Sequence, residues 1–211
     1  MAVTAGRRIA EAASAFVTVA IIGSAGKDGR LAAADRALFE VVRAHRSTAR
    51  TTVARIVSTL GEPVVVYPAL IAGTSMARRA GWRRASMSCL VVVTGAAARR
   101  RLSQVIARQR PPAEAWLAAP EGYSLPSKHT TLAALAAGAC MHGLGARGTP
   151  AQAAPLLAAA CVGASRVYLG VHWPADVVAG WLFAEGWLRL IDPEDGPGHG
   201  DGDGGRFRWP R

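Results

Sequence analysis

The segment 165–176, SRVYLGVHWPAD, gathers side chains whose types and spacing suit phosphoryl transfer. Arg166 carries a guanidinium that can pair with two phosphate oxygens and stays charged in almost any surroundings. Asp176 follows His172 by four residues, a spacing at which its carboxylate can accept the Nδ1 proton and free Nε2 as a nucleophile. The segment therefore predicts a histidine that attacks phosphorus beside a cationic clamp for phosphate.

Two further polar clusters occur earlier in the chain, ARQRPP at 107–112 and PSKHT at 126–130. Arg110 adds a second guanidinium for phosphate, and His129 adds an acid–base group that can protonate a leaving oxygen. Ser127 and the backbone N–H groups that begin the following helix supply neutral donors where the helix dipole favours an anion. These segments carry no carboxylate cluster of the kind that holds magnesium, so the sequence favours a reaction without metal or cofactor.

Apolar, alanine-rich stretches separate the polar clusters and predict the elements that position them. They cover residues 12–26, 52–77, 86–98, 130–146, 151–169 and 174–191. The short segments between them hold most of the arginine, lysine, proline and glycine, which is the layout of a polytopic helical membrane protein. We therefore expect an all-α transmembrane bundle of about five to six membrane helices. If the helices alternate in direction, the polar clusters meet at one mouth of the bundle.

Composition limits the class of protein and of partner. The 211 residues are 51% hydrophobic, enough for one domain with a sizeable core, and the net charge of +11 indicates an anionic partner. The charge alone does not choose among nucleic acid, lipid headgroups and a phosphorylated substrate, and its placement between apolar stretches favours a membrane setting. Together with the resemblance described below, it leads us to expect a lipid phosphate substrate and membrane lipids as partners, and no nucleic acid. The three cysteines are widely spaced among small apolar residues, which argues against a disulfide framework or a zinc site. We expect a membrane-embedded domain over 1–191 and a disordered tail, rich in glycine and aspartate, over 192–211.

Two segments outside the clusters bear on the membrane. Residues 32–46 are typical of an amphipathic helix at the interface, or of an ordinary connector between helices. The apolar face of this helix would consist of Ala34, Leu38, Val41 and Val42. The segment ARRAGWRR at 77–84 marks the cytoplasmic side by the positive-inside rule, which places the polar clusters on the extracytoplasmic side.

Glu62 lies within the predicted span 52–77, where an ionisable side chain is costly and often functional. A hydrogen bond to another helix beside Pro63 would explain it equally well. His142 lies on an apolar helix without an acidic neighbour and is interpreted as a core or interface residue.

Taken in order, the polar clusters resemble the signature of the type 2 phosphatidic acid phosphatase (PAP2) superfamily, over about residues 30–190. Its Ser-Arg-x5-His-x3-Asp motif is complete in 165–176, and its Pro-Ser-x-His motif is present at 126–129, with Lys128 where glycine is commonest. Its Lys-x6-Arg-Pro motif keeps Arg110 and the proline after it, but Ser103 stands in place of the lysine. The residues that could supply the missing charge are Arg99, Arg100 and Lys128.

The resemblance implies a role for each matching residue. His172 would form a phosphohistidine, Asp176 would orient it, and His129 would act first as general acid and then as the base that activates water. Stabilisation of the transferring phosphoryl group would come from Arg110, Ser127, Lys128, Ser165 and Arg166. The resemblance also implies a helical core like that of the PAP2 phosphatases and haloperoxidases, with no metal and no cofactor.

The function expected from this resemblance is an integral membrane lipid phosphatase of the cell envelope. Its substrate would be a polyprenyl phosphate or diphosphate, a polyprenyl-phosphosugar or a glycerolipid phosphate, hydrolysed in the plasma membrane with the site facing the extracytoplasmic side. Two alternatives stay open. The absent motif lysine would suit a catalytically inactive membrane scaffold or lipid-phosphate-binding protein, and the related haloperoxidases suggest a vanadate-dependent oxidase. The sequence leaves the lipid and the oligomeric state undetermined.

Overall fold

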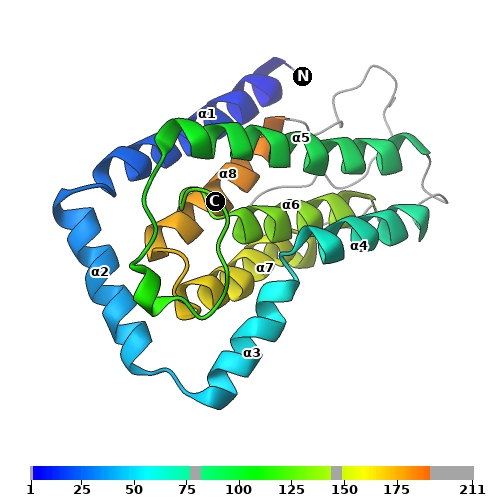
Figure 1. The fold of residues 1–211 in the computed structure, drawn as a ribbon. Helices are drawn as coiled ribbons and strands as arrows, with labels where there is room; N and C mark the ends of the chain where they lie inside the picture. The colour runs from blue at the N-terminus through cyan, green and yellow to red at the C-terminus, as the bar shows by residue number, and fades with distance from the viewer. Residues whose placement is uncertain (1, 77–81, 144–148, 191–211) are drawn as a thin grey trace.

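The computed structural model describes residues 2–76, 82–143 and 149–190, and every regular element in these ranges is helical (Figure 1). The α-helices are α1 (Ala2–Ala25), α2 (Gly29–Ala44), α3 (Thr48–Thr59), α4 (Pro63–Met76), α5 (Trp82–Ile106), α6 (Lys128–Gly143), α7 (Thr149–Tyr168) and α8 (Pro174–Leu190). A short 3-10 helix, η2, spans Ala113–Ala115 in the loop between α5 and α6. The expectation of an all-α fold is confirmed. The tail 192–211 and most of the segment 77–84 lie outside the described residues.

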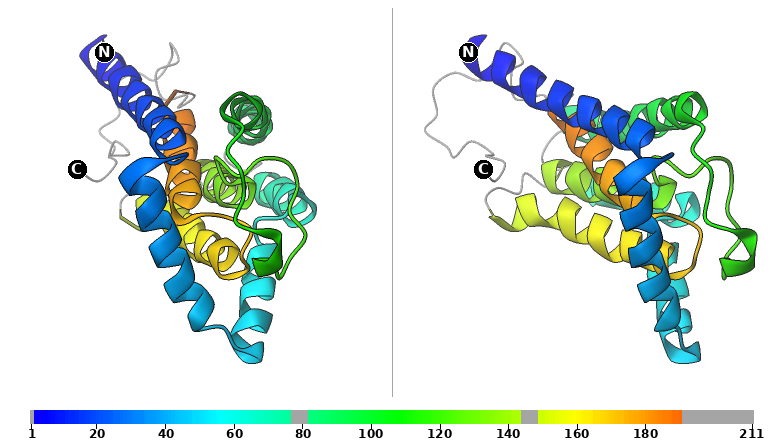
Figure 2. Two further views of the ribbon diagram at one scale, coloured as in Figure 1. Left: turned by 60° about the vertical axis from the view of Figure 1, so that its left-hand side comes forward. Right: turned by 90° about the vertical axis from the view of Figure 1, so that its left-hand side faces the viewer.

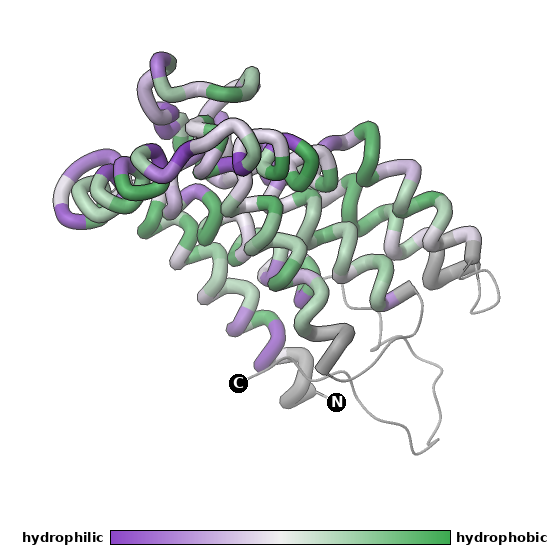
Figure 3. Tube along the Cα trace, turned by 90° about the horizontal axis from the view of Figure 1, so that it is seen from below, coloured by the Kyte–Doolittle hydropathy of each residue, from purple (hydrophilic) through white to green (hydrophobic). Residues whose placement is uncertain are grey.

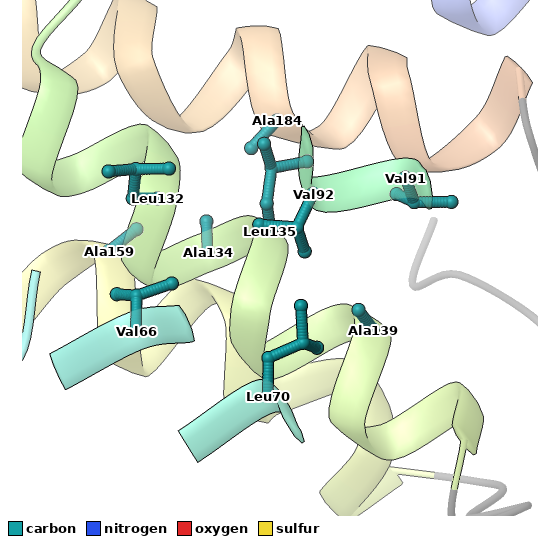
Figure 4. Packing of buried hydrophobic residues seen from close by; sticks show 10 residues of the cluster. All are labelled: Val66, Leu70, Val91, Val92, Leu132, Ala134, Leu135, Ala139, Ala159 and Ala184. Atoms are coloured by element: carbon teal, nitrogen blue, oxygen red, sulfur yellow. The ribbon is translucent and has the colours of Figure 1, made fainter. Parts of the chain in front are cut away.

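Helix α6 lies at the centre of the bundle and contacts α4, α5, α7 and α8. Its Leu132 and Leu135 are almost completely buried, and Figure 4 shows them between apolar side chains of the neighbouring helices. The partners are Val66 and Leu70 of α4, Val91 and Val92 of α5, Ala159 of α7 and Ala184 of α8. Burial of such side chains stabilises the fold by about 1.5–3 kcal/mol each for the larger ones. The core thereby fixes the relative positions of the helix ends that carry the polar clusters.

Close approach between α7 and α8 depends on Gly163. A Cβ added at Gly163 would lie 2.1 Å from Cγ1 of Val177, a distance that real carbon atoms do not tolerate. The absence of a side chain lets the two helices pack tightly where α7 nears its end and α8 begins. These helix ends carry Arg166 and Asp176, so the glycine brings the two halves of the last polar cluster together.

The predicted stretch 52–77 is divided between two helices. Helices α3 and α4 meet at a bend of 50°. Pro63 opens α4, where its missing N–H is not needed for a helical hydrogen bond. The break contains Gly61 and Glu62 and ends at Pro63, so a proline kink is the sequence signal for it.

Helices α2 and α3 run across the end of the bundle at which α7 ends and α8 begins (Figures 1 and 2). The predicted helix 32–46 is confirmed as α2, but the outward face is the one that carries Leu38 and Val41, which are 51% and 56% exposed. The inward face buries Phe39 and, unexpectedly for a helix at the edge of the bundle, the carboxylate of Asp35. A buried carboxylate requires a partner, which the site described below provides.

Among the described residues, one helical segment, Gly6–Ala25, is long and apolar enough to cross a membrane by itself. Thr48–Thr59 and Pro63–Gly73 meet the same criterion when taken together across the bend. Helices α6 and α8 contain 16 and 17 residues, fewer than the roughly 20 that a straight crossing requires. Figure 3 shows hydrophobic residues along the helices of the bundle and many of the hydrophilic ones gathered toward one end.

Candidate active site

The polar clusters meet at the end of the bundle where α7 ends and α6 and α8 begin. Nη1 of Arg110 lies 3.2 Å from Nε2 of His172, which joins the first cluster to the third. The backbone N–H of Ser127 donates to the backbone oxygen of Asp176 over 3.1 Å, which joins the second to the third. The convergence expected from alternating helices is therefore present in the structure.

A tight chain reversal at the end of α7 places His172. The N–H of Gly170 donates to the oxygen of Val167, and the N–H of Val171 donates to the oxygen of Arg166. This pair of bonds is a Schellman motif, which requires a left-handed residue, and Gly170 has φ +81°. A Cβ at Gly170 would also lie 2.1 Å from the backbone oxygen of Ala115. The reversal thus fixes His172 relative to Arg166.

The imidazole of His172 is 1% exposed and has a defined orientation. A guanidinium can only donate, so Nε2 accepts from Arg110 and carries a lone pair. Nδ1 faces Oδ2 of Asp176 at 3.5 Å, an ion-pair separation slightly longer than a normal hydrogen bond. Burial lowers the pKa of His172 to about 4 although Asp176 opposes the shift, so the ring is neutral at pH 7. The geometry leaves the lone pair on Nε2, the nitrogen that the sequence analysis predicts to be the nucleophile.

Asp176 is completely buried and accepts several hydrogen bonds in addition to facing His172. Its Oδ2 accepts from the backbone N–H of Trp173 over 2.8 Å and from the hydroxyl of Ser124. Its Oδ1 accepts from Nη1 of Arg108 over 2.5 Å. These bonds fix the carboxylate in the position expected of the residue that orients the nucleophile.

Arg108 is a site residue that the sequence analysis missed. Its guanidinium is 3% exposed and bridges Asp176 to Asp35, whose Oδ2 lies 2.6 Å from Nη2. Nη2 also donates to the backbone oxygen of Gly26, at the end of α1, over 2.9 Å. Oδ1 of Asp35 in turn accepts from the N–H of Ala175, in the first turn of α8. The available sequence signal was Asp35, a carboxylate in register with Ala32 and Phe39 on one helical face.

Backbone oxygens fix the guanidinium of Arg110. Nε donates to Gly122, Nη2 donates to Glu121 and Tyr123, and Nη1 donates to Val171, over distances of 2.6–3.0 Å. The contact with His172 occupies the last of its five N–H groups. Burial lowers the pKa of Arg110 from its usual value, an effect that Asp176 opposes. A cavity of about 260 Å³ lies beside this side chain, lined in part by Pro111 and Trp116.

The remaining predicted phosphate ligands differ in whether they have a hydrogen-bonding group left to bind phosphate. Arg166 is 4% exposed and donates through Nη1 to the hydroxyl of Ser58 in α3 over 2.7 Å. Its Nε is buried without a hydrogen-bond partner among the described residues. Ser127 is buried, and its hydroxyl oxygen accepts from Thr130 over 3.0 Å. Arg166 therefore has a donor directed into the interior that a phosphoryl oxygen could satisfy.

Lys128 and Ser165 already have partners. Nζ of Lys128 lies 3.0 Å from Oε2 of Glu121, which is 82% exposed at the rim of the site. This interaction lowers the pKa of the Glu121 carboxyl. The hydroxyl of Ser165 donates to the backbone oxygen of Val162, one turn earlier in the same helix, over 2.6 Å. The backbone N–H of Lys128 at the start of α6 remains the part of this residue suited to an anion.

Arg99 is the arginine of α5 that is placed to supply the charge of the missing motif lysine. Ser103 is 4% exposed on α5 and is too short to reach far beyond the helix. One turn earlier, Nη1 of Arg99 donates to the backbone oxygen of Pro126 over 2.9 Å, next to the second cluster, whereas Arg100 is exposed. Of the two arginines suggested to replace the lysine, Arg99 is thus the one that contacts the second cluster, while the ammonium of Lys128 is paired with Glu121.

Glu62 contacts the second predicted catalytic histidine. Its Oε1 lies 2.7 Å from Nε2 of His129, and the two side chains are 38% and 5% exposed. The sequence left open whether Glu62 was functional or formed a hydrogen bond between helices, and the structure shows that its partner belongs to the site. The described residues include no group of three or more His, Cys, Asp or Glu side chains arranged to hold a metal ion.

Comparisons with known proteins agree with this geometry. A family model of the PAP2 superfamily matches residues 86–191. The crystal structure of a transmembrane PAP2 type phosphatidylglycerolphosphate phosphatase from Bacillus subtilis aligns with a TM-score of 0.76 and 25% identity, over 88% of this chain and 96% of that one. An undecaprenyl-diphosphatase from Sulfolobus acidocaldarius is 50% identical over 36 residues, which is 17% of this chain and 17% of that protein.

Proposed function

Because the chain belongs to the PAP2 superfamily, we propose that it is a membrane phosphatase that hydrolyses a lipid phosphate or diphosphate through a phosphohistidine on His172. The observation that carries this proposal is the buried imidazole of His172, which lies between a guanidinium and a carboxylate. Its Nε2 faces the guanidinium of Arg110 at 3.2 Å, and its Nδ1 faces Asp176. A nucleophile beside a cationic clamp is the arrangement that phosphoryl transfer requires.

In the first step, Nε2 of His172 attacks phosphorus and the bond to the lipid oxygen breaks. His129 donates a proton to this leaving oxygen, and Asp176 stabilises the positive charge that develops on the His172 ring. As the N–P bond forms, the N–H of Arg110 that faces Nε2 in the structure donates its hydrogen bond to a phosphoryl oxygen instead, and the guanidinium keeps its proton. Arg166 and the N–H groups at the start of α6 stabilise the other oxygens.

In the second step, His129 accepts a proton from water while the water oxygen attacks phosphorus. The N–P bond breaks, Nε2 regains its lone pair, and phosphate leaves. His129 is protonated again at the end of the cycle, so the reaction consumes one water and needs no other reactant. Metal and cofactor play no part in this scheme.

Several observations support a membrane location with a lipid substrate. The Bacillus subtilis phosphatase is transmembrane, and its fold extends over 88% of this chain. In our proposal the domain 1–191 crosses the plasma membrane with about five to six helical segments, the shorter ones extended by arginines at their ends. The positive charge of the segment 77–84 supports an extracytoplasmic site.

The names of the relatives support two substrate classes, a glycerolipid phosphate and a polyprenyl diphosphate. The match to the diphosphatase is short, so the proposal includes both classes, together with polyprenyl phosphates and polyprenyl-phosphosugars. A second candidate function is that of a membrane scaffold that binds lipid phosphates without turnover. Ser103 at the position of the motif lysine favours this second candidate.

Phosphate release in detergent tests the proposal. The wild type, His172→Ala and the exposed control His45→Ala are compared on lipid phosphates of the proposed classes, with EDTA present. We expect the wild type and the control to release phosphate and His172→Ala to release none. When a reaction of the wild type with labelled substrate is quenched, we expect a radioactive protein adduct that is labile to acid. Binding of phosphate without release from any lipid would support the scaffold, and halide oxidation on adding vanadate would support the oxidase.

A further inference from the structure

We propose that Glu62 positions and polarises His129, so that a carboxylate–histidine pair serves the leaving oxygen of the substrate. This inference rests on the proposed function and adds to it a positioning residue. The observation that carries it is the 2.7 Å contact between Oε1 of Glu62 and Nε2 of His129.

The backbone around Glu62 is built for this contact. A Cβ at Gly61 would lie 2.8 Å from both the Cβ and the backbone oxygen of His129, so only glycine permits the break between α3 and α4 to approach α6 this closely. The backbone oxygen of Glu62 accepts from the N–H groups of Val65 and Val66, in the first turn of α4, over 2.9 and 2.8 Å. The backbone of Glu62 is therefore anchored to the first turn of α4, which fixes the point from which its side chain extends toward His129.

The contact determines which nitrogen of His129 carries which proton. A carboxylate only accepts hydrogen bonds, so Nε2 of His129 holds a proton directed at Glu62. Nδ1 is buried and has no hydrogen-bond partner among the described residues. Buried polar atoms without partners are rare in proteins, and a substrate oxygen would satisfy this one. Nδ1 is thus the nitrogen that donates to the leaving oxygen and then accepts a proton from water.

Charge around His129 gives the carboxylate a second role. The guanidinium of Arg166 and the ammonium of Lys128 both interact electrostatically with His129, and their charge repels an imidazolium. The carboxylate of Glu62, 2.7 Å from Nε2, offsets this repulsion. Without it, the protonated form that donates to the leaving oxygen would face two cations and no anion.

The dependence of the rate on the leaving group tests this role. The substrates are dodecyl phosphate, whose alkoxide leaves poorly without a proton, and 4-dodecyl-2-nitrophenyl phosphate, whose phenolate leaves readily. In single-turnover experiments we expect Glu62→Gln to slow the alkyl ester about 10- to 100-fold and the aryl ester by less than about threefold, because general acid catalysis matters most for poor leaving groups. Glu62→Asp, which keeps the charge, should fall between Glu62→Gln and the wild type.

Matched variants separate this role from a structural one. Glu40→Gln, on the exposed face of α2, should leave the ratio of the two rates unchanged. In a His129→Ala background, Glu62→Gln should change neither rate by more than about twofold, because the effect of the carboxylate passes through the histidine. Full additivity of the two substitutions would overturn the inference.

The outcomes for the inference and for the proposed function are distinct. If the wild type is active and Glu62→Gln lowers the rate equally on both esters, Glu62 serves only the fold. That result would overturn the inference and leave the proposed function standing. Failure of the wild type to release phosphate from either ester and from the lipid panel would overturn the proposed function and the inference together.

Discussion

Replacement of Arg108 by glutamine should destabilise the protein strongly, because one guanidinium neutralises two buried carboxylates. Its nitrogens lie 2.6 Å from Asp35 and 2.5 Å from Asp176, and the three side chains are 3%, 4% and 0% exposed. Loss of one partner from a buried ion pair costs about 3–5 kcal/mol, since the remaining charge stays desolvated. For a chain of this length the loss corresponds to a fall of about 6–20 °C in the unfolding midpoint.

The assay is thermal unfolding in detergent. Arg43→Gln is the matched control, because its ion pair with Glu40 is exposed on both sides and should contribute at most about 1 kcal/mol. Asp35→Asn should cost less than Arg108→Gln, since Arg108 keeps Asp176 as a partner and the asparagine oxygen can still accept from Ala175. A midpoint for Arg108→Gln no lower than that of Arg43→Gln would refute the assignment of a buried, paired guanidinium.

Two further predictions concern the chemistry. Since burial lowers the pKa of His172 to about 4 and attack requires the neutral ring, the phosphorylation rate on 4-dodecyl-2-nitrophenyl phosphate, whose phenolate leaves without a proton from His129, should stay level from neutral pH to about pH 5 and fall only below it. A stopped-flow pH profile with a fall centred near 6.5, the value of an ordinary histidine, would contradict this. Arg99→Gln should lower kcat/KM about tenfold or more, because a charge-assisted contact is lost. Arg101→Gln, on the exposed side of α5, should stay within about twofold of the wild type. Equal effects of the two substitutions on kcat/KM in a phosphate-release assay would show that Arg99 does not belong to the site.

The sequence was enough to predict which polar side chains lie together when their chemistry and spacing are visible within one short segment. His172 and Asp176 are four residues apart, so the relation between them follows from one tight turn and the start of a helix. Arg110 and Ser127 could be placed beside them because alternating helices return the chain to the same end of a bundle. These inferences needed only helix direction, which hydropathy reveals.

The contacts that could not be predicted join residues far apart in the sequence. Arg108 is separated from Asp35 by 73 positions and from Asp176 by 68, and no periodicity links them. A kink at Pro63 could be expected from the proline, but its direction could not. The partner of His129 was therefore unknown, since Glu62 reaches it only through the bend and the missing side chain of Gly61.

The partners of Arg110 bear on how this protein can diversify. Four of its five N–H groups bind main-chain oxygens, which every amino acid supplies. Positions 121 and 123 can therefore exchange side chains over evolutionary time while the clamp keeps its shape, whereas Gly122, with φ +64°, is favoured as glycine. Under the proposed function, selection for a different lipid head group would act through Tyr123, which lines the cavity, without moving the main-chain oxygens that hold Arg110, so recognition and catalysis would be genetically separable at this position.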